Sequence, residues 1–371
     1  MRVFNIDSNG ATETNSLDAL SAQKSEGQAY LWVACTRDEF SGKLNEIQST
    51  LQSVCGMQLV DLHISDLLNS HIPSHYDYTS QYDILVFRRL AAGHTGSDTE
   101  PSPAKSSISK RGPPILKRID TSPVGFAVFG KILLTVHPGD CTVRESYAAK
   151  LLAASSTESR ANGVRLPTNP ADLMLRIINL MVDGFLELRR GLTHQLDHWQ
   201  SQLLDPQSRF SNWGSLLEAR LTLHYLDEIC EDQRSAIQDW IEAINTWPDA
   251  PTPQLEREHD LLKVRSRDVL EHIERVVHHV RRLEQSAETA VQMHFNAQGN
   301  RTNDIMRTLT ALTAIFLPLN LIAGIFGMNF EFLPFIHLHQ GFWWAMGTML
   351  AIAVSLSLLF WRKRYLARTS R

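Results

Sequence analysis

Apolar positions are concentrated near the end of this chain, where two long segments lack any charged side chain. The first runs from about Leu309 to Phe326 and the second from about Gly341 to Trp361. Each is close to the ~20 residues that a helix needs to cross a bilayer. A charge at mid-bilayer costs roughly 2.5 to 3.5 kcal/mol, so charge-free segments of this length favour membrane insertion. The sequence predicts a hairpin of two transmembrane helices, at 308–327 and 342–361.

Basic residues lie on one side of this predicted hairpin. Arg301 and Arg307 precede the first span, and the tail 362–371 is rich in Arg and Lys, whereas the loop 328–341 contains neither residue type. The positive-inside rule therefore predicts that both termini face the cytoplasm. The loop side chains on the outer side would include Glu331, His337 and His339.

The N-terminal part alternates short apolar runs with amphipathic segments. The runs, which are typical of strands, are Tyr30–Cys35, Leu59–His63, Ile84–Phe87 and Gly125–Val136. The regions Phe40–Cys55 and Arg144–Ala154 are predicted as helices. We expect an α/β domain over 1–167, with a flexible Ser, Pro, Gly and Lys-rich insertion at about 92–114.

After Asn169-Pro170, a helix-start signal, the pattern becomes helical and stays so. Helices are predicted at about Ala171–Leu204 and Trp213–Trp247, forming an antiparallel pair within 168–254. After Leu255, successive apolar positions are separated alternately by four and by three residues. This heptad-like seam consists of Val269, Ile273, Val276, Val280, Leu283, Ala287 and Ala290.

The segment 255–307 is therefore predicted as a stalk helix that continues into the first membrane span. A helix of this length, on the order of 100 Å at 1.5 Å per residue, needs neighbours. We expect these to be copies of the same chain arranged around an axis perpendicular to the membrane.

Composition narrows the function. The net charge of -4 argues against a nucleic-acid-binding surface. Four widely spaced cysteines without a C-x-x-C pair suggest reduced cytosolic thiols. Because the chain has no phosphate-binding glycine loop, nucleophile elbow or H-E-x-x-H motif, it is not expected to be an enzyme.

One face of the first span is polar or small. At helical spacing this polar stripe comprises Asn303, Met306, Thr310, Thr313, Leu317, Asn320 and Gly324, and it opens onto Asn329. Thr and Asn can simply bond across a helix interface in membranes. A whole stripe instead favours rings of oxygen ligands around a symmetry axis, as a hydrated cation pathway requires. Met306, Leu309 and Leu317 could then form apolar constrictions that gate by dewetting.

Three sequence runs closely resemble the CorA family of divalent-cation transporters. They are Arg301–Arg307, Ile315–Pro318 and Ile322–Phe330, the last containing the Gly327-Met328-Asn329 signature. The resemblance extends across nearly the whole chain. It implies a funnel-shaped homopentamer in a bacterial inner membrane that passes Mg2+, with Co2+ and Ni2+ as further permeants.

The resemblance also assigns roles to individual residues. Asn329, with Gly327 and Met328, would form the outer ring that meets the hydrated ion, and Asn320 would form the next polar ring. Asn303, Met306 and Leu309 match the inner constriction of the family. Mg2+ dehydrates reluctantly, so neutral oxygens acting through its water shell suit it.

Asp268 matches the position of an acidic regulatory residue in the family. With an acid of a neighbouring subunit it would hold Mg2+ and close the pore when internal Mg2+ is high. The partner acid cannot be placed by alignment, and Asp98 and Glu100 are weak candidates. Considered without the resemblance, Asp268 beside Arg265 and Arg267 would form a surface ion pair worth about 0 to 1 kcal/mol.

The outer loop departs from the family pattern. Leu333-Pro334-Phe335-Ile336 lacks a second acid that the family commonly has, so Glu331 stands alone, and His337 and His339 follow. Imidazole suits Zn2+, Co2+ or Ni2+ better than Mg2+. A Zn2+ transporter like those of the ZntB branch is therefore one alternative. A non-conducting, membrane-anchored sensor or scaffold is a second.

Overall fold

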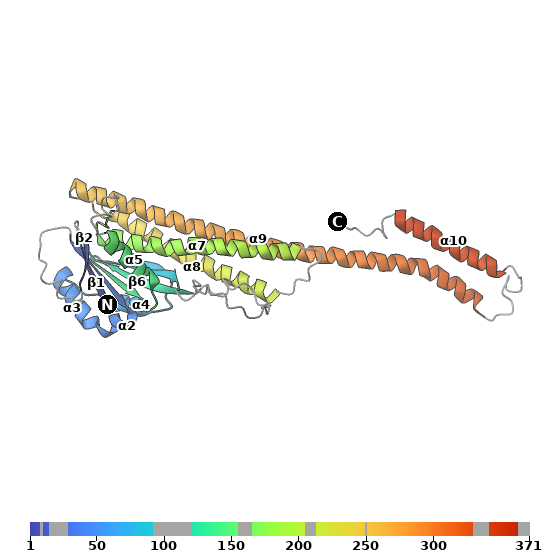
Figure 1. Ribbon diagram of the computed structural model, residues 1–371, viewed down its shortest axis with the longest axis horizontal. Helices are drawn as coiled ribbons and strands as arrows, with labels where there is room; N and C mark the ends of the chain where they lie inside the picture. The colour runs from blue at the N-terminus through green and yellow to red at the C-terminus, as the bar shows by residue number, and fades with distance from the viewer. Residues whose placement is uncertain are drawn as a thin grey trace. The chain divides into compact units, whose positions relative to one another are not determined.

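The computed structural model describes residues 1–7, 10–14, 29–91, 120–154, 165–204, 213–248, 251–328 and 341–362 (Figure 1). The chain divides into two compact units. Unit 1 comprises Met1–Gln202 and Ser208–Glu288, and unit 2 comprises Leu203–Gln207 and Thr289–Arg371. The predicted insertion at 92–114 and nearly all of the basic tail lie outside the described residues.

Unit 1 contains a seven-stranded sheet with the order β2-β1-β3-β7-β6-β5-β4. The strands are β1 (Arg2–Asp7), β2 (Gly10–Thr14), β3 (Tyr30–Thr36), β4 (His75–Tyr78), β5 (Asp83–Leu90), β6 (Thr121–Val128) and β7 (Ile132–His137). Of the described neighbours, β3 and β7 pair in parallel and the other pairs are antiparallel. The predicted α/β class is confirmed.

Several strand predictions differ from the structure. The run Leu59–His63 was predicted as a strand, but Asp61–Leu68 forms helix α4. His63 and Leu67 of α4 are buried at a spacing of four, and the run 59–63 is too short to show that helical spacing. The run Gly125–Val136 is divided between β6 and β7, with Phe129 N–H donating to Ile132 O at 2.8 Å in the turn. Strands β1, β2 and β4 were not predicted.

One face of the sheet is covered by α2 (Arg37–Gly42), α3 (Leu44–Cys55) and α4. Phe40, Ile47, Leu51 and Leu67 from these helices join the buried core cluster. At Gly125 of β6 a Cβ would lie 2.2 Å from Leu67 Cδ2, so glycine allows α4 to pack directly on the strand. Because α2 and α3 are separate, the predicted helix Phe40–Cys55 is in fact two.

The other face packs against α5 (Thr142–Ala154) and the helical layer. Trp32 stacks on Phe4 at 4.8 Å between ring centroids and meets the edge of Tyr147 of α5. The Trp32 indole N–H donates to Thr135 Oγ1 at 2.9 Å, which satisfies its polar atom in the core. The domain is therefore a sheet between two helical layers.

The helical layer of unit 1 consists of α7 (Pro170–Leu204), α8 (Trp213–Thr246) and the first part of α9 (Pro253–Phe326). Asn169 caps α7, because its Oδ1 accepts from Asp172 N–H at 2.8 Å. Helix α8 contacts β4 and β5. The three predicted helices are thus present, with ends within a few residues of those expected.

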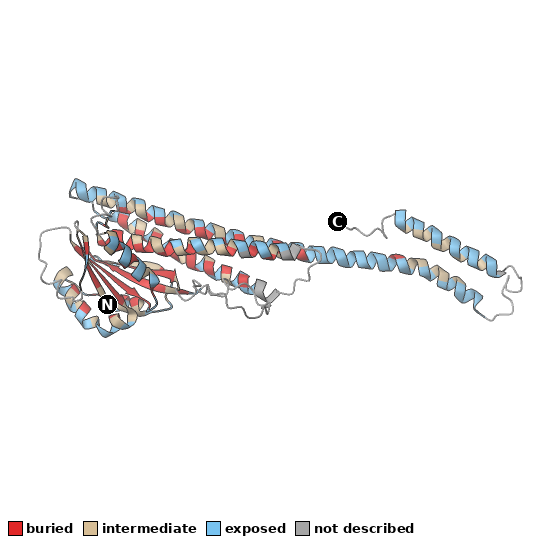
Figure 2. Cartoon of the chain, in the orientation of Figure 1, coloured by how far each residue is buried: buried red, intermediate tan, exposed pale blue. Residues whose placement is uncertain are grey.

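The heptad-like seam of α9 is buried within the single chain, from Val269 to Ala287 (Figure 2). Hydrogen bonds hold α9 to its neighbours in unit 1: Trp240 Nε1–H of α8 donates to Ser266 Oγ at 3.0 Å, and Gln200 Nε2–H of α7 donates to Ser286 Oγ at 2.6 Å. The expectation that copies of the chain cover this seam was therefore wrong for unit 1. Helices α7 and α8 cover it instead.

Candidate ion-conduction site

Unit 2 contains the end of α9 and helix α10 (Gly341–Arg362), the two helices long and apolar enough to cross a membrane. On α9 the buried or half-buried positions of the span lie on one face. They are Ala311, Ala314, Ile315, Pro318, Leu319 and Ile322. On α10 they are Ala345, Met349, Ile352, Ala353, Leu356, Ser357 and Phe360. We infer that these two faces pack together in the hairpin.

The polar stripe predicted from the sequence lies on a different face of α9. Every member from Asn303 to Gly324 is exposed, with exposed fractions of 61% for Met306 and 69% for Leu317. Leu309, predicted as a constriction, is 62% exposed. At about 100° per residue, the stripe is on roughly the opposite side of the helix from the Ala311–Ile322 face. The stripe is therefore available to another molecule, not to α10.

The threonines of the stripe present oxygen acceptors. The hydroxyl of Thr310 donates to Met306 O at 2.8 Å, and that of Thr313 donates to Leu309 O at 2.9 Å. The hydrogen of each hydroxyl is thus used within the helix, while lone pairs remain on the oxygen. The water shell of a cation turns its hydrogens outward, so these acceptors match a hydrated cation.

The glycines of the site have different local surroundings. A Cβ at Gly324 would meet nothing within 4 Å in this chain. Glycine costs roughly 1 kcal/mol relative to alanine inside a helix, and packing within the chain does not account for it here. Gly324 is therefore suited to close approach by another helix. At Gly327 the backbone N–H donates to Ala323 O at 2.9 Å, which extends the last turn of α9, and Met328 N–H donates to Ile325 O at 3.3 Å.

The remaining residues predicted for the pore mouth cannot be placed. Asn329, Glu331, His337 and His339 lie outside the described residues. The structure therefore places the whole stripe, from Asn303 to Gly324, on helix α9, and Gly327 and Met328 follow directly after its last residue, Phe326. Trp343 and Trp344, at the start of α10, are each 72% exposed, as a residue of a membrane-interface belt would be.

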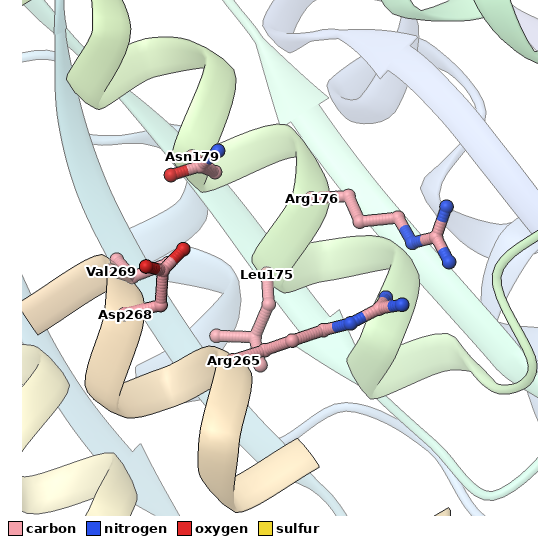
Figure 3. Close-up of a pocket in the computed structure, with 6 residues that line it drawn as sticks. All are labelled: Leu175, Arg176, Asn179, Arg265, Asp268 and Val269. Carbon is pink, nitrogen blue, oxygen red and sulfur yellow. The ribbon is translucent and has the colours of Figure 1, made fainter. Parts of the chain in front are cut away.

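Asp268 lines a cavity of about 280 Å³ between α7 and α9 in unit 1 (Figure 3). The cavity is lined by Leu175, Arg176, Asn179, Arg265, Asp268 and Val269. In Figure 3 the Asp268 carboxylate points toward Asn179, whereas the guanidinium groups of Arg176 and Arg265 point away from it. The carboxylate is more than half exposed, with an exposed side-chain fraction of 59%.

Asp268 and Arg265 do not form the ion pair expected from the sequence. Arg265 pairs instead with Asp172, which is buried on α7 and also lies 3.4 Å from Arg176 Nε. Burial lowers the pKa of Arg265. The partner of Asp268 is His272, whose Nε2 lies 3.8 Å from Asp268 Oδ1.

Sequence reasoning missed two polar residues beside Asp268. His272 Nδ1 lies 3.2 Å from Asn179 Oδ1, so the three side chains form a chain across the α7–α9 interface. Asn179 is 93 positions away from His272, a separation at which local spacing carries no signal. No cluster of three or more His, Cys, Asp or Glu side chains that could hold a metal occurs among the described residues, at Asp268 or elsewhere.

Comparison with known proteins decides the family. The CorA-like Mg2+ transporter protein family matches residues 27–364. The chain belongs to this family. The CorA-like proteins are transporters, so the prediction that the chain is not an enzyme is confirmed.

The chain is similar in sequence to a curated relative and similar in fold to two solved structures. The chain is 26% identical over 195 residues to the cobalt/magnesium transport protein CorA of Thermotoga maritima. These aligned residues make up 52% of each protein. The match therefore spans about half the length of that relative. The complete CorA magnesium transporter of Methanocaldococcus jannaschii has a similar fold, with a TM-score of 0.66, 16% identity and 98% coverage of both chains. A full-length CmaX protein gives a TM-score of 0.65 at 16% identity, covering 98% of this chain and 97% of its own.

Proposed function

We propose that this CorA-like protein conducts divalent cations across a membrane, with Mg2+ as its main cargo. The observation that carries the proposal is the uncharged, acceptor-rich stripe of α9, which is exposed on roughly the opposite side from the α10-facing residues. The names of the relatives include magnesium and cobalt, which supports a divalent cargo. Co2+ and Ni2+ are further permeants under this proposal.

The ion path is formed between copies of the chain. One helix cannot enclose a column of water, and Asn and Thr side chains are unfavourable against lipid, so several α9 helices would turn their stripes toward a common axis. A homopentamer gives five-membered rings of Asn320, Thr313 and Thr310. Met306, Leu309 and Leu317 provide apolar rings that close the path by dewetting. Gly324 allows these helices to approach closely.

The protein acts in the bacterial inner membrane with both termini in the cytoplasm. The basic residues that precede the first span and follow the second, with none in the loop between them, support this orientation. Asn329, with Gly327 and Met328, forms the outer entrance. Five copies would place one ring of Glu331 carboxylates there, which attracts cations over a Debye length.

Internal Mg2+ closes the path through Asp268. Three features support this role: the carboxylate is 59% exposed, it lines a cavity, and its oxygens face the Asn179 amide (Figure 3). Carboxylate and amide oxygens are ligands that Mg2+ accepts, with water completing an octahedron. The described residues of one chain hold no cluster of three metal-ligating side chains, and under this proposal a neighbouring copy contributes the remaining ligands.

The cargo is tested with the purified protein in liposomes that contain Mg2+- or Zn2+-sensitive dyes. We expect Mg2+ to enter down an imposed gradient, and Glu331→Gln to reduce entry mainly at low ionic strength, where the Debye length is ~30 Å at about 0.01 M salt. The double variant His337→Ala, His339→Ala should transport Mg2+ as the unmodified protein does.

Two results would contradict the Mg2+ assignment. Entry of Zn2+ that depends on His337 and His339, without entry of Mg2+, would favour a zinc transporter. If neither ion enters although the protein is correctly assembled, the sensor or scaffold alternative is favoured. The matched control is His278→Ala, an exposed histidine of unit 1, which should leave both fluxes unchanged.

A further inference from the structure

Three strands of unit 1 end together at one edge of the sheet. Strands β3 and β7 are parallel. Strand β5 runs in the same direction as β7, because both are antiparallel to β6, which lies between them. Arg37 follows β3, Arg88 and Arg89 lie near the end of β5, and His137 ends β7. In α/β sheets, ligands commonly bind at the carboxyl ends of the strands.

The arginines at this edge have incomplete hydrogen bonding. Arg89 is 1% exposed; its NH1 donates to Leu90 O at 2.7 Å and its NH2 donates to Asp140 Oδ1 at 2.8 Å, but its buried Nε has no partner. Arg37 donates from NH2 to Pro123 O, and its buried Nε also has no partner. A buried donor without an acceptor is unfavourable.

Positive charge exceeds negative charge at this edge. Among the described residues Arg37 has no ion pair, and the donors of Arg88 go to the neutral acceptors Ile72 O, Thr121 Oγ1 and Thr121 O. Asp140 is the carboxylate that pairs with Arg89, and its side chain is 54% exposed. The carboxylate that holds the buried Arg89 is therefore itself in reach of solvent.

The electrostatic environment agrees with this geometry. Burial, followed by repulsion from Arg88 and Arg89, lowers the pKa of Arg37. Burial and the positive charges of Arg144, Arg89 and Arg37 lower the pKa of His137 to about 3, so this imidazole is neutral at physiological pH. A negatively charged ligand would relieve the repulsion among the arginines.

We propose that the carboxyl edge of β3, β5 and β7 binds a phosphate group between the guanidinium groups of Arg37 and Arg89. Guanidinium donors form charge-assisted, often bidentate hydrogen bonds with phosphate oxygens. The orphan Nε donors of both arginines would gain acceptors. Asp140 holds Arg89 when no anion is bound and competes with the ligand for it.

The test is a titration of the full-length protein in detergent with inorganic pyrophosphate, and separately with ATP, followed by calorimetry. No divalent cation is added, because Mg2+ would complex both ligands. We expect Arg37→Gln to weaken binding by about tenfold or more, as loss of a charge-assisted hydrogen bond should. Asp140→Asn should strengthen binding, because the competing carboxylate is removed. Arg190→Gln, at a side chain that is 74% exposed on α7, is the matched control and should change nothing.

The outcomes separate clearly. Equal affinity for pyrophosphate and ATP would support recognition of phosphate alone, and tighter ATP binding would support a nucleotide as the phosphate source. The proposal is overturned if the unmodified protein binds neither ligand, if Arg37→Gln binds as tightly as the unmodified protein, or if Arg190→Gln loses as much affinity as Arg37→Gln. Because binding is measured without ion flux, none of these results bears on the transport proposal.

Discussion

Two parts of the same helix, α9, use their apolar and polar positions in contrasting ways. Between Val269 and Ala287 the seam residues are buried within the chain, and Ile273 is 0% exposed. Between Asn303 and Gly324 the stripe residues are exposed, and Leu317 is 69% exposed. The first part is completed by α7 and α8 of its own chain. The second part has a half-buried face, which we infer packs on α10, and a stripe that none of the described residues covers.

This contrast indicates which part of the helix stabilises the protein and which part serves function. Burial of the seam contributes roughly 25 cal/mol per Å² of apolar surface to folding of unit 1. The stripe contributes no such burial in one chain. Changes at the seam should therefore act on stability, whereas changes at the stripe should act on transport and assembly.

The largest effect is expected from placing a charge in the seam. Ile273→Asp buries a carboxylate without a partner, and we expect it to lower the free energy of unfolding of unit 1 by about 3 to 5 kcal/mol. Denaturant unfolding followed by circular dichroism measures this change. Val264→Asp is the matched control, because Val264 is 60% exposed on the same helix, and it should cost less than about 1 kcal/mol. Equal losses in both variants would show that the seam is not the stabilising face.

A smaller effect is expected from pH, which should act on unit 1 but not on the uncharged span. The folded-state pKa of His137 is lowered to about 3, below its reference value of about 6.5 in the unfolded chain. The unfolded state therefore binds a proton first as pH falls, and stability is lost between about pH 6.5 and pH 3. From His137 alone we expect a loss of about 2 kcal/mol at pH 5.

This pH dependence is measured by unfolding at pH 7.5 and pH 5. His137→Asn should reduce the difference between the free energies of unfolding at the two pH values. His278→Asn, at an exposed histidine, should leave that difference unchanged. If His137→Asn shows the same difference as the unmodified protein, His137 does not account for the acid sensitivity.

The smallest effect is expected at the cavity between α7 and α9. Asp268→Ala removes a carboxylate that lies opposite Asn179, so we expect a several-fold rise in the Mg2+ concentration that protects the cytosolic part from protease. Asp268→Lys should raise it further, because it adds a positive charge. Glu274→Ala, on the same helix away from this cavity, is the control. An unchanged protection curve in both Asp268 variants would argue against a regulatory role.

Sequence reasoning predicted the long helices well and the sheet only in part. The helical periodicity of apolar residues and the positions of the prolines predicted α7, α8, α9 and α10 to within a few residues. Short strands carry less signal: β4 has four residues, and β1 and β2 lie where no apolar run was recognised. The seam residues were identified correctly, but their partners were not, because a heptad pattern does not say which helix covers it.

In the candidate site, too, features set by local spacing could be predicted from the sequence and features set by tertiary packing could not. The stripe could be derived because its members share one helix face at a regular spacing. The surroundings of Asp268 could not, because Asn179 and His272 meet through tertiary packing of α7 on α9. The roles of Asn329, Glu331, His337 and His339 stay predictions, since these residues lie outside the described part of the chain.

The most direct test of the account compares Mg2+ flux into liposomes for two variants of the span. Asn320→Leu replaces a polar member of the exposed stripe, and Leu312→Ala changes a residue that is 49% exposed but lies off the stripe. If the stripes of several copies line the ion path, Asn320→Leu should reduce flux by about tenfold or more, and Leu312→Ala should retain most of it, with both variants equally assembled. Unchanged flux in Asn320→Leu, or equal losses in the two variants, would contradict the account.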